Sequence, residues 1–442
     1  MSLFELHYVN KEAEQKRLEK QQKSIQNAFK ELLVSSRKQQ IQEQQLLSNY
    51  GLHAGTRVES SNSLYADDTS SIHSVSSIFS SLHSSASSIT TIDSDTNDRD
   101  DYGFKKPFEW IKPEKIYEFE SRYKTIQQKQ SKRWYTLLQN NHHQWPELCP
   151  ELIHYVRKGL PPQVRAKAWM HYSGAGTHME ANPGLYQSLL LQIEQEPTLI
   201  DESIQKDLFR TFPDNTHFTK DTKITMLQHV LSAFSLYLPD IGYCQSLNFL
   251  AGFLLLFYDT EEQVFWMLVT IVQDYFPKEM FDTTMQGTQL EQTVLMNLIY
   301  EHMPAIWSKI SDKKCFWEYE QVQGEFPSIT FITTHWFLTM YIHILPVETV
   351  LRVWDCFFIE GFKVLYQVAL TILKLNEQRI YEAEDAIEAF QILQSMPKRM
   401  IDCDQFIKCI FSSKNDIVLD LTLQDIDHKR ILFRTRKQQR LS

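Results

Sequence analysis

The chain has 442 residues, a formal net charge of -10 at pH 7, 43% hydrophobic residues and 12 glycines. Its length suffices for two or three domains with buried cores, and its acidic balance excludes a general attraction to nucleic acid or to an anionic membrane. The scarcity of glycine argues against β-sandwiches, β-barrels and glycine-rich nucleotide cradles, because these need positive φ angles or close backbone approach. We therefore predict a predominantly helical protein.

The cysteines and apolar segments indicate the cellular compartment. The six cysteines contain no Cys-x-x-Cys pair, so the sequence indicates neither a zinc site nor a redox motif. The N-terminus lacks the apolar core of a signal peptide, and the longest apolar stretch, residues 247–258, is about half of what a bilayer span requires. Reduced thiols are the simplest interpretation. We expect a soluble, cytoplasmic protein without a metal site.

The first segment, residues 1–50, is rich in Gln, Lys and Glu and places Leu18, Ile25, Leu32 and Leu46 on one heptad position. This thin apolar stripe favours a solvated helical arm. The arm is either a lone helix or one chain of a weak coiled coil. In the second case the apolar stripe would bind a partner helix.

The second segment, residues 51–101, is rich in serine. Fifteen serines lie between Ser60 and Ser94, and no Lys or Arg lies between Arg57 and Arg99. Such a composition cannot offset the entropy lost on ordering, so it predicts a disordered linker. The serines can accept phosphate, and an inert spacer is the alternative interpretation.

Aromatic residues become dense from residue 102, and we assign residues 102–158 to a helical lead-in. Residues 117–138 carry apolar side chains near helical spacing with basic residues between them, which predicts a helix that packs one face on the main body. A basic and aromatic mixture can also contact RNA, but no motif of a nucleic-acid fold accompanies it. We expect no nucleic-acid partner.

Residues 159–376 alternate apolar stretches with breaks at proline and glycine, which predicts one large all-α domain. The clearest predicted helices are 224–238, 245–258, 263–275, 289–299, 330–344 and 347–358. Flanking helices are predicted in residues 377–425. Residues 426–442 are rich in Lys and Arg and form a basic tail, either a frayed terminus or a contact for acidic lipid.

One candidate site lies in residues 204–213. On a helix, Asp207 is one turn before Arg210 and can accept from its guanidinium, while Ile204 anchors in the core and Pro213 closes the helix. An arginine held in this way is aimed outward, and its planar fork suits phosphate oxygens. Taken alone, the pair is more typical of an ordinary surface ion pair.

A second candidate is Gln245, which follows Gly242 and opens an apolar run. A glutamine side chain there can accept from a water through its carbonyl and donate to a phosphate oxygen through its NH₂, as attack on a γ-phosphate requires. The alternative is that Gln245 caps a buried helix. The neighbouring Cys244 has no histidine in its motif and is interpreted as a small buried residue.

The third block, residues 332–361, mostly builds a core. Asp355 can serve as a buried acceptor for a helix end or for an arginine. His335 and His343 have no carboxylate at metal-ligand spacing between them, which argues against zinc.

Four motifs that follow one another along the chain together resemble one protein family. They are Gly159-Leu-Pro-Pro-Gln-Val-Arg165, Ile204-x-x-Asp207-x-x-Arg210, Gly242-Tyr243-Cys-Gln245-x-x-Asn248 and Leu345-Pro-Val-Glu through Trp354-Asp355. Together the motifs resemble the TBC domain of Rab GTPase-activating proteins, over residues 102–376. The lead-in Tyr102-Gly103-Phe104 resembles the growth-hormone-regulated branch of that family and its fungal relatives.

The resemblance implies an all-helical fold and a role in vesicle trafficking, peripheral on endomembranes. It implies that Arg210 is an arginine finger for the γ-phosphate of a GTP-bound Rab, and that Gln245 orients the attacking water. GTP and Mg²⁺ would arrive with the partner, so the chain would need no cofactor of its own. The implied supporting residues are Asp207, Tyr243, Asn248 and Arg165.

Two departures from the family pattern stand out. Ser246 occupies a position where the family usually has glycine, which we interpret as a mild change at a helix start. Tyr366-Gln367 occupies the position of the usual Phe-Arg and is expected to alter an ion pair at the edge of the core.

Two competing hypotheses remain for the function. One is a scaffold that binds a small GTPase without accelerating hydrolysis, and the other is a helical solenoid, which the lack of an internal repeat disfavours.

Overall fold

The computed structural model describes residues 98–196, 202–218, 221–281, 285–321, 326–412, 418 and 421–441. The chain divides into a unit of residues 1–74 and a unit of residues 75–442, and every described residue belongs to the second unit. The predicted arm, 1–50, and most of the predicted linker, 51–101, lie outside the described residues.

The last residues of the predicted linker are ordered, which corrects the boundary at residue 101. The Asp100 carboxylate accepts hydrogen bonds from the backbone N–H groups of Tyr102 and Phe104, at 3.0 and 2.9 Å. Arg99 forms an isolated antiparallel bridge with Lys105. Aspartate stabilises tight turns through such bonds to the following backbone, and this turn was hidden by the serine-rich composition that precedes it.

The prediction of an all-α fold is confirmed, since every regular element among the described residues is a helix. In chain order these are α3 (Pro113–Asn140), α4 (Pro150–Arg157), α5 (Pro162–Ser173), α6 (Ala175–Ala181), α7 (Leu185–Gln195), α8 (Glu202–Leu208), α9 (Asp221–Tyr237), α10 (Leu247–Leu254), α11 (Glu261–Thr270), η2 (Ile271–Tyr275), α12 (Gln286–His302), α13 (Pro304–Ile310), α14 (Phe316–Gln321), α15 (Thr330–Leu338), α16 (Val347–Glu360), α17 (Lys363–Leu375), α18 (Glu377–Glu382), α19 (Ala386–Ser395), η3 (Pro397–Arg399), α20 (Cys403–Ile410) and α22 (Leu423–Leu441).

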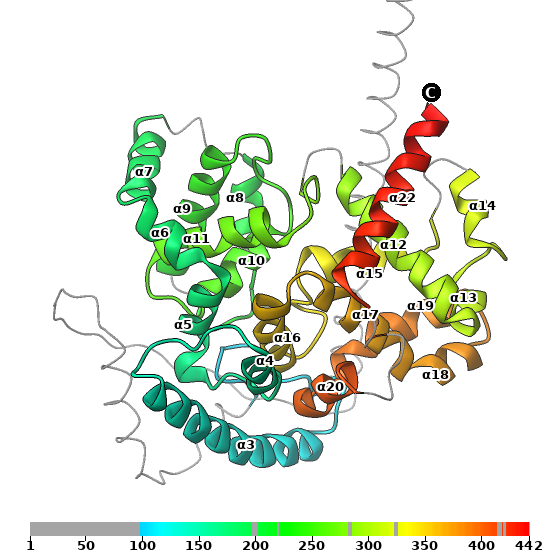
Figure 1. Cartoon of the computed structure of the whole chain (residues 1–442), viewed down its shortest axis with the longest axis horizontal. Coiled ribbons are helices and arrows are strands. Elements are labelled where there is room, and N and C mark those ends of the chain that lie inside the picture. The colour runs from blue at the N-terminus through cyan, green and yellow to red at the C-terminus, as the bar shows by residue number, and fades with distance from the viewer. Residues whose placement is uncertain are drawn as a thin grey trace, which may run out of the picture. The chain divides into compact units, whose positions relative to one another are not determined.

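Two groups of helices surround buried central helices (Figure 1). In the first group, α11 packs against α5, α6, α9 and α10, and in the second, α16 packs against α4, α5, α17 and α20. Every residue from Thr349 to Phe358 of α16 and from Val364 to Leu373 of α17 is buried. Helices that are buried all round belong to the interior of a large domain, and α5 contacts both groups.

One predicted helix, 330–344, is shorter in the structure. Helix α15 ends at Leu338, and Met340, Tyr341 and His343 have positive φ angles. The turn is held from two sides, because Trp354 donates its indole N–H to the Met340 carbonyl at 3.0 Å and Tyr341 donates its hydroxyl to the Leu365 carbonyl at 2.6 Å. These long-range bonds override the local apolar pattern, which alone would continue the helix.

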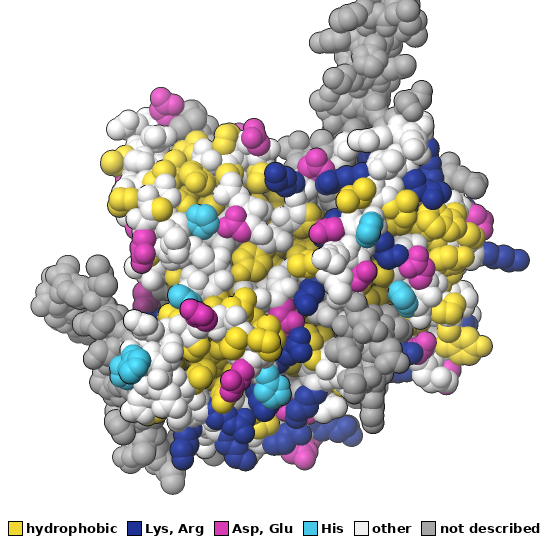
Figure 2. Space-filling model, viewed as in Figure 1, with side chains coloured by type: hydrophobic (Ala, Val, Ile, Leu, Met, Phe, Trp, Pro, Cys, Tyr) yellow, Lys and Arg dark blue, Asp and Glu magenta, His cyan; other side chains and the backbone are white. Residues whose placement is uncertain are grey.

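Helix α3 confirms the predicted lead-in helix. It buries Ile116, Tyr123, Trp134 and Leu138 against the body. The exposed Lys and Arg side chains of its outer face contribute to the dark blue groups at the lower edge of Figure 2. The basic residues between the aromatic ones therefore lie on a solvated helix face.

Helix α22 corrects the boundary between flanking helices and a basic tail, because it runs continuously from Leu423 to Leu441. It packs against α12, where Arg430 binds the buried carboxylate of Glu291 through two hydrogen bonds of 2.8 and 2.7 Å. The predicted tail is thus part of a docked helix. Among the described helices, none is both long and apolar enough to cross a membrane.

Candidate functional site

The first part of the site follows helix α8. Ile204 and Leu208 are buried and anchor the helix, whereas 69% of the Arg210 side chain is exposed. Its Nη1 lies 3.8 Å from Oδ1 of Asp207, whose side chain is only 14% exposed. The predicted pairing of Arg210 with Asp207 is present as a loose ion pair, in which the guanidinium keeps its donors open to solvent.

The predicted helix through Arg210 ends earlier, which corrects the role given to Pro213. Helix α8 stops at Leu208, and the Thr211 hydroxyl donates to the Asp207 carbonyl at 2.8 Å. Hydroxyl groups that bond to nearby carbonyls compete with helical hydrogen bonding. Arg210 therefore lies on a turn just beyond the helix end.

The second part of the site is the turn before helix α10. Gln245 is exposed on this turn, and the helix begins two residues later, at Leu247. Ser246 has a φ of 100°, in the left-handed region that favours glycine. The Ser246 N–H donates to Oδ1 of Asn248 at 3.2 Å. Gln245 is consequently not a cap of a buried helix, and the substitution of serine for the family's usual glycine is not the mild change that we expected.

Side chains in the two turns and in the adjoining ends of α8 and α10 bond directly to one another. Tyr243 donates its hydroxyl to Oδ2 of Asp207 at 2.9 Å, and Asn248 donates from Nδ2 to the Thr211 hydroxyl at 3.0 Å. Each bond joins one turn to the other across more than thirty residues of sequence. Asp207, Tyr243 and Asn248 therefore hold together the two segments that carry the exposed side chains of Arg210 and Gln245.

Gly252 brings helix α10 close to residues 209–212, the turn that carries Arg210 and is here called the arginine turn. A Cβ atom at this position would lie 2.7 Å from Cγ2 of Thr211 and 3.0 Å from Cε2 of Phe212. Real Cβ atoms essentially never approach other atoms to less than 3 Å. Glycine is thus required here by space rather than by a positive φ angle.

An aromatic cluster, composed of Phe104, Phe212, Phe249 and His343, supports the arginine turn. His343 lies 5.1 Å from the Phe212 ring and 5.4 Å from the Phe249 ring. The His343 side chain is exposed to solvent, so its ring packs on the outer side of this cluster rather than in its interior.

The second histidine of this region, His335, has its ring 6.3 Å from the Phe249 ring, and burial, with a smaller effect of His343, lowers the pKa of His335 to about 4. Within the described ranges, no group of three or more His, Cys, Asp or Glu side chains could hold a metal ion.

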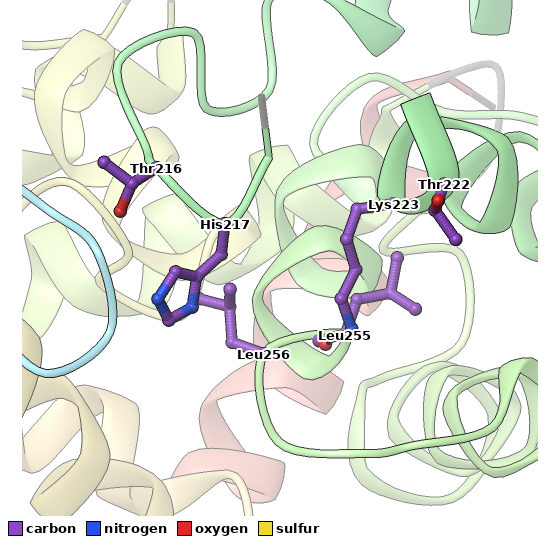
Figure 3. A pocket seen from close by; sticks show the side chains of 6 residues that line it. All are labelled: Thr216, His217, Thr222, Lys223, Leu255 and Leu256. Carbon is purple, nitrogen blue, oxygen red and sulfur yellow. Dashed lines mark hydrogen bonds between the residues drawn. The ribbon is translucent and has the colours of Figure 1, made fainter. Parts of the chain in front are cut away.

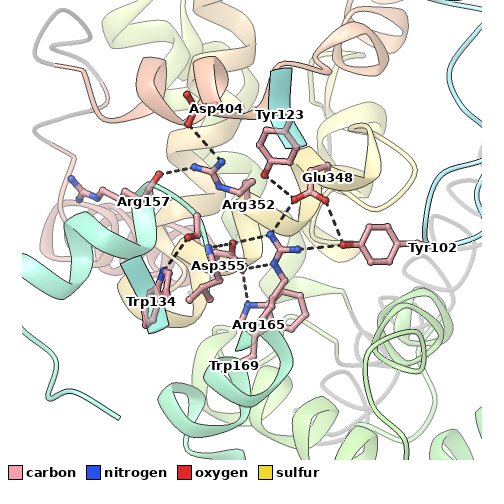
Figure 4. A network of polar contacts seen from close by, with 12 residues as sticks. Tyr102, Tyr123, Trp134, Arg157, Arg165, Trp169, Glu348, Arg352, Asp355 and Asp404 are labelled. Carbon is pink, nitrogen blue, oxygen red and sulfur yellow. Dashed lines mark hydrogen bonds and ion pairs between the residues drawn. The ribbon is translucent and has the colours of Figure 1, made fainter. Parts of the chain in front are cut away.

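Arg165, a predicted supporting residue, is not part of the exposed site. Its side chain is 1% exposed and binds Oδ1 of Asp355 and Oε1 of Glu348, each at 3.1 Å (Figure 4). Burial alone would lower the pKa of Arg165, but the carboxylates of Asp355 and Glu348 raise it well above its ordinary value. The Asp355 carboxylate also accepts hydrogen bonds from the Leu160 N–H and the Trp169 indole. It therefore binds the backbone just before helix α5 as well as an arginine.

A pocket of about 370 Å³ lies next to the arginine turn (Figure 3). Thr216 and His217 line it from the loop that follows Arg210, together with Lys223 and Leu255, but neither Arg210 nor Gln245 does. Lys223 donates to the Leu255 carbonyl at 2.6 Å, and burial lowers its pKa. The pocket is therefore separate from the exposed pair of side chains.

Sequence reasoning missed Thr211, His343 and the turn at residues 99–104 as parts of this site. Thr211 follows Arg210 directly and its hydroxyl both accepts and donates a hydrogen bond. The Tyr102-Gly103-Phe104 motif was a signal for the turn, because a glycine among aromatic residues often marks a close backbone approach.

Comparisons with known proteins place the chain in one family. The family model described as Rab-GTPase-TBC domain matches residues 162–381. The chain is 32% identical to the GTPase-activating protein MSB4 of Saccharomyces cerevisiae, covering 79% of this chain and 83% of that protein. It is 35% identical to the human growth hormone-regulated TBC protein 1, covering 72% and 90%. This confirms the resemblance to the growth-hormone-regulated branch and its fungal relatives.

A solved structure is also similar. The Chlamydomonas flagellar RabGAP TBC domain superposes with a TM-score of 0.57 at 25% identity, covering 72% of this chain and 99% of that chain. The helical fold thus belongs to a known architecture, and with the matches in sequence the chain is a member of the Rab-GTPase-TBC domain family.

Proposed function

We propose that the chain accelerates GTP hydrolysis by a GTP-bound Rab-family GTPase, with Arg210 and Gln245 entering the partner's nucleotide site. The family and the relatives named as GTPase-activating proteins support Rab GTPase activation. The assignment to these two side chains rests on one observation. Both are exposed, and their turns are joined by the Tyr243–Asp207 and Asn248–Thr211 hydrogen bonds.

The reaction joins a water oxygen to the γ-phosphorus and breaks the bond between that phosphorus and the β–γ bridging oxygen. Negative charge develops on the γ-oxygens and on the leaving β-phosphate, and the water's proton passes to phosphate oxygen. The guanidinium of Arg210 neutralises this charge, while the carboxamide of Gln245 accepts from the water and donates to a γ-oxygen. An arginine finger supplies about 10³ to 10⁵ in rate, or about 4 to 7 kcal/mol of the barrier.

The loose Asp207 contact suits this role. A separation of 3.8 Å restrains the guanidinium without occupying its donors, and the Asp207 carboxylate is itself held by Tyr243. Preorganised donors cost little reorganisation when charge develops on the phosphate. GTP and Mg²⁺ come with the partner, and the chain contributes side chains alone.

Single-turnover GTP hydrolysis across a panel of Rab proteins tests the proposal. We expect the wild-type chain to accelerate at least one Rab, Arg210→Ala to lose most of that acceleration, and Gln245→Ala to lose a large part of it. The matched controls are Arg133→Ala and Gln128→Ala, which alter exposed side chains of α3 and should retain full activity.

Two results would contradict the proposal. If the wild-type chain binds a GTP-bound Rab but accelerates none, the chain is a scaffold or effector rather than an activator. If it accelerates a Rab and both Arg210→Ala and Gln245→Ala keep full activity, other residues carry the chemistry.

A further inference from the structure

The turn formed by residues 99–104, here called the N-terminal turn, is braced by its own side chains. Asp100 accepts from the N–H groups of Tyr102 and Phe104, and the Gly103 N–H donates to the Asp100 carbonyl at 3.1 Å. Arg99 donates from Nη1 to the Gly103 carbonyl at 2.9 Å. The turn therefore has a defined shape, although it lies more than fifty residues before the matched family range of 162–381.

The N-terminal turn binds the loop that follows Arg210. Asn215 is 1% exposed and donates from Nδ2 to the Tyr102 carbonyl at 2.9 Å. The Thr216 N–H donates to the Gly103 carbonyl at 3.3 Å, and Arg99 donates to the Asp214 carbonyl at 2.5 Å. Three consecutive residues of the loop are thus bonded to backbone or side-chain atoms of the turn.

Packing reinforces these bonds on both sides of Gly103. The Phe104 ring meets the Phe212 ring edge to face, with centroids 5.0 Å apart. Gly103 has a φ of +84°, and a Cβ atom there would lie 2.7 Å from both Oδ1 of Asn215 and Oγ1 of Thr216. The contact surface has no room for a side chain, so the loop position depends on glycine.

The other end of the turn is attached to the buried charge network. The Tyr102 hydroxyl lies 3.4 Å from Nη1 of Arg165 and 3.5 Å from Oε2 of Glu348, as Figure 4 shows. Burial, followed by the charge of Glu348, raises the pKa of Tyr102, so its hydroxyl stays protonated. The buried charge network is thereby connected through the turn to the loop that follows Arg210.

We propose that the N-terminal turn is a positioning element for Arg210. It fixes residues 212–217 against the interior, and through Thr211 it sets where the guanidinium meets the transition state. The inference rests on the proposed function. It implies that the catalytic unit begins near Arg99 rather than at the start of the matched family range.

The test compares two glycine substitutions in the full chain. Gly103→Ala introduces both φ strain and a clash with the loop, whereas Gly174→Ala introduces strain at a φ of +86° with no atom within 4 Å. We expect Gly103→Ala to lower kcat by about 10- to 100-fold, since a displacement of about 1 Å can cost 10²-fold in rate. KM for the GTP-bound Rab should change little, and Gly174→Ala should retain its kcat.

A double-variant cycle separates positioning from general damage. In the Arg210→Ala background, Gly103→Ala should cause no further loss, because the group that it displaces is absent. Arg99→Ala, which removes the bonds to Gly103 and Asp214 without a clash, should give a smaller loss of the same kind if Gly103→Ala fails to fold. Arg99→Lys, which keeps a donor, should restore part of it.

The outcomes distinguish this inference from the proposed function. If Arg210→Ala loses activity but Gly103→Ala and Arg99→Ala keep the wild-type kcat, the turn does not position the arginine and the proposed function stands. An equal fold-loss from Gly103→Ala with and without Arg210 assigns the turn a structural role alone. If the wild-type chain accelerates no Rab, both proposals fail together.

Discussion

Two arginines of this molecule each lie beside an aspartate, but in opposite environments. Arg165 is 1% exposed and is enclosed by Asp355 and Glu348 at 3.1 Å. Arg210 is 69% exposed and lies 3.8 Å from Asp207. Burial forces tight pairing because an unpaired buried charge is costly, whereas exposure leaves the guanidinium free to bind a visiting anion. The same residue type thus joins helices in one region and faces a partner in the other.

The difference predicts opposite responses to the same substitution. Arg165→Ala leaves two carboxylates without their cation, one of them fully buried, and should lower the free energy of unfolding by about 3 to 5 kcal/mol. Arg210→Ala should change it by less than about 0.5 kcal/mol. Urea unfolding followed by circular dichroism measures both. Equal midpoints for the two variants would contradict the division between a structural and a reactive arginine.

The pH dependence of stability should report on the turn that connects these two regions. Burial, with smaller effects of Asp101 and Glu348, raises the pKa of Asp100 from 3.8 to about 6, against the hydrogen bonds from Phe104 and Tyr102. Between these values the folded state binds a proton that the unfolded state does not, so this group's contribution to stability rises as pH falls from above 6 toward 4.

Asp100→Asn isolates that contribution, because the amide oxygen can accept the same N–H bonds without a charge. At pH 7.5 the variant should be more stable than the wild type by on the order of 1 to 3 kcal/mol. The advantage should shrink at pH 5, and urea midpoints at the two pH values measure it. An advantage that is independent of pH would show that Asp100 does not titrate in this range.

A smaller effect on stability is expected from removing the hydrogen bond that joins the two exposed turns. Tyr243→Phe removes the hydroxyl that binds the Asp207 carboxylate at 2.9 Å, a bond of the kind worth about 1.5 to 3 kcal/mol. We expect stability to fall by about 1 to 2 kcal/mol and single-turnover GTP hydrolysis to slow roughly threefold to tenfold, since Asp207 no longer restrains Arg210 as well.

Tyr237→Phe is the matched control, because the Tyr237 hydroxyl makes no hydrogen bond in the described part of the chain. It should leave both quantities nearly unchanged. If the two variants slow hydrolysis equally, the link between the turns does not affect the arginine.

The sequence predicted those features that local pattern determines. The apolar spacing of α3 and α16 and the Asp207–Arg210 interval are local, and the structure shows the helices and the ion pair. The contact between Asn215 and Tyr102 spans 113 residues and leaves no local trace. The helix end at Leu338 depends on the indole of Trp354 in another helix, so it could not be read from the apolar pattern. The end at Leu208 is accompanied by a local hydrogen bond from the Thr211 hydroxyl to the Asp207 carbonyl, a signal that lies in the sequence but outside the apolar pattern.

Backbone conformation was equally hidden, and Ser246 is the clearest case. A serine before an apolar run is typical of an ordinary helix start, where the residue has an extended backbone. Its actual φ is 100°, and the Asn248 side chain accepts from the Ser246 N–H and donates to the Thr211 hydroxyl. A side chain with a Cβ therefore occupies a strained position immediately after Gln245.

Ser246→Gly should relieve this strain. A non-glycine residue in the left-handed region costs about 1 to 2 kcal/mol, and the greater freedom of glycine in the unfolded chain offsets about 0.5 to 1 kcal/mol of the gain. We expect a net stabilisation of about 0.5 to 1 kcal/mol with Gln245 still exposed and hydrolysis unimpaired. Ser246→Ala keeps the Cβ and should give no such gain. Since the Ser246 hydroxyl is absent from both variants, equal urea midpoints for the two would show that the backbone at this position stores no strain.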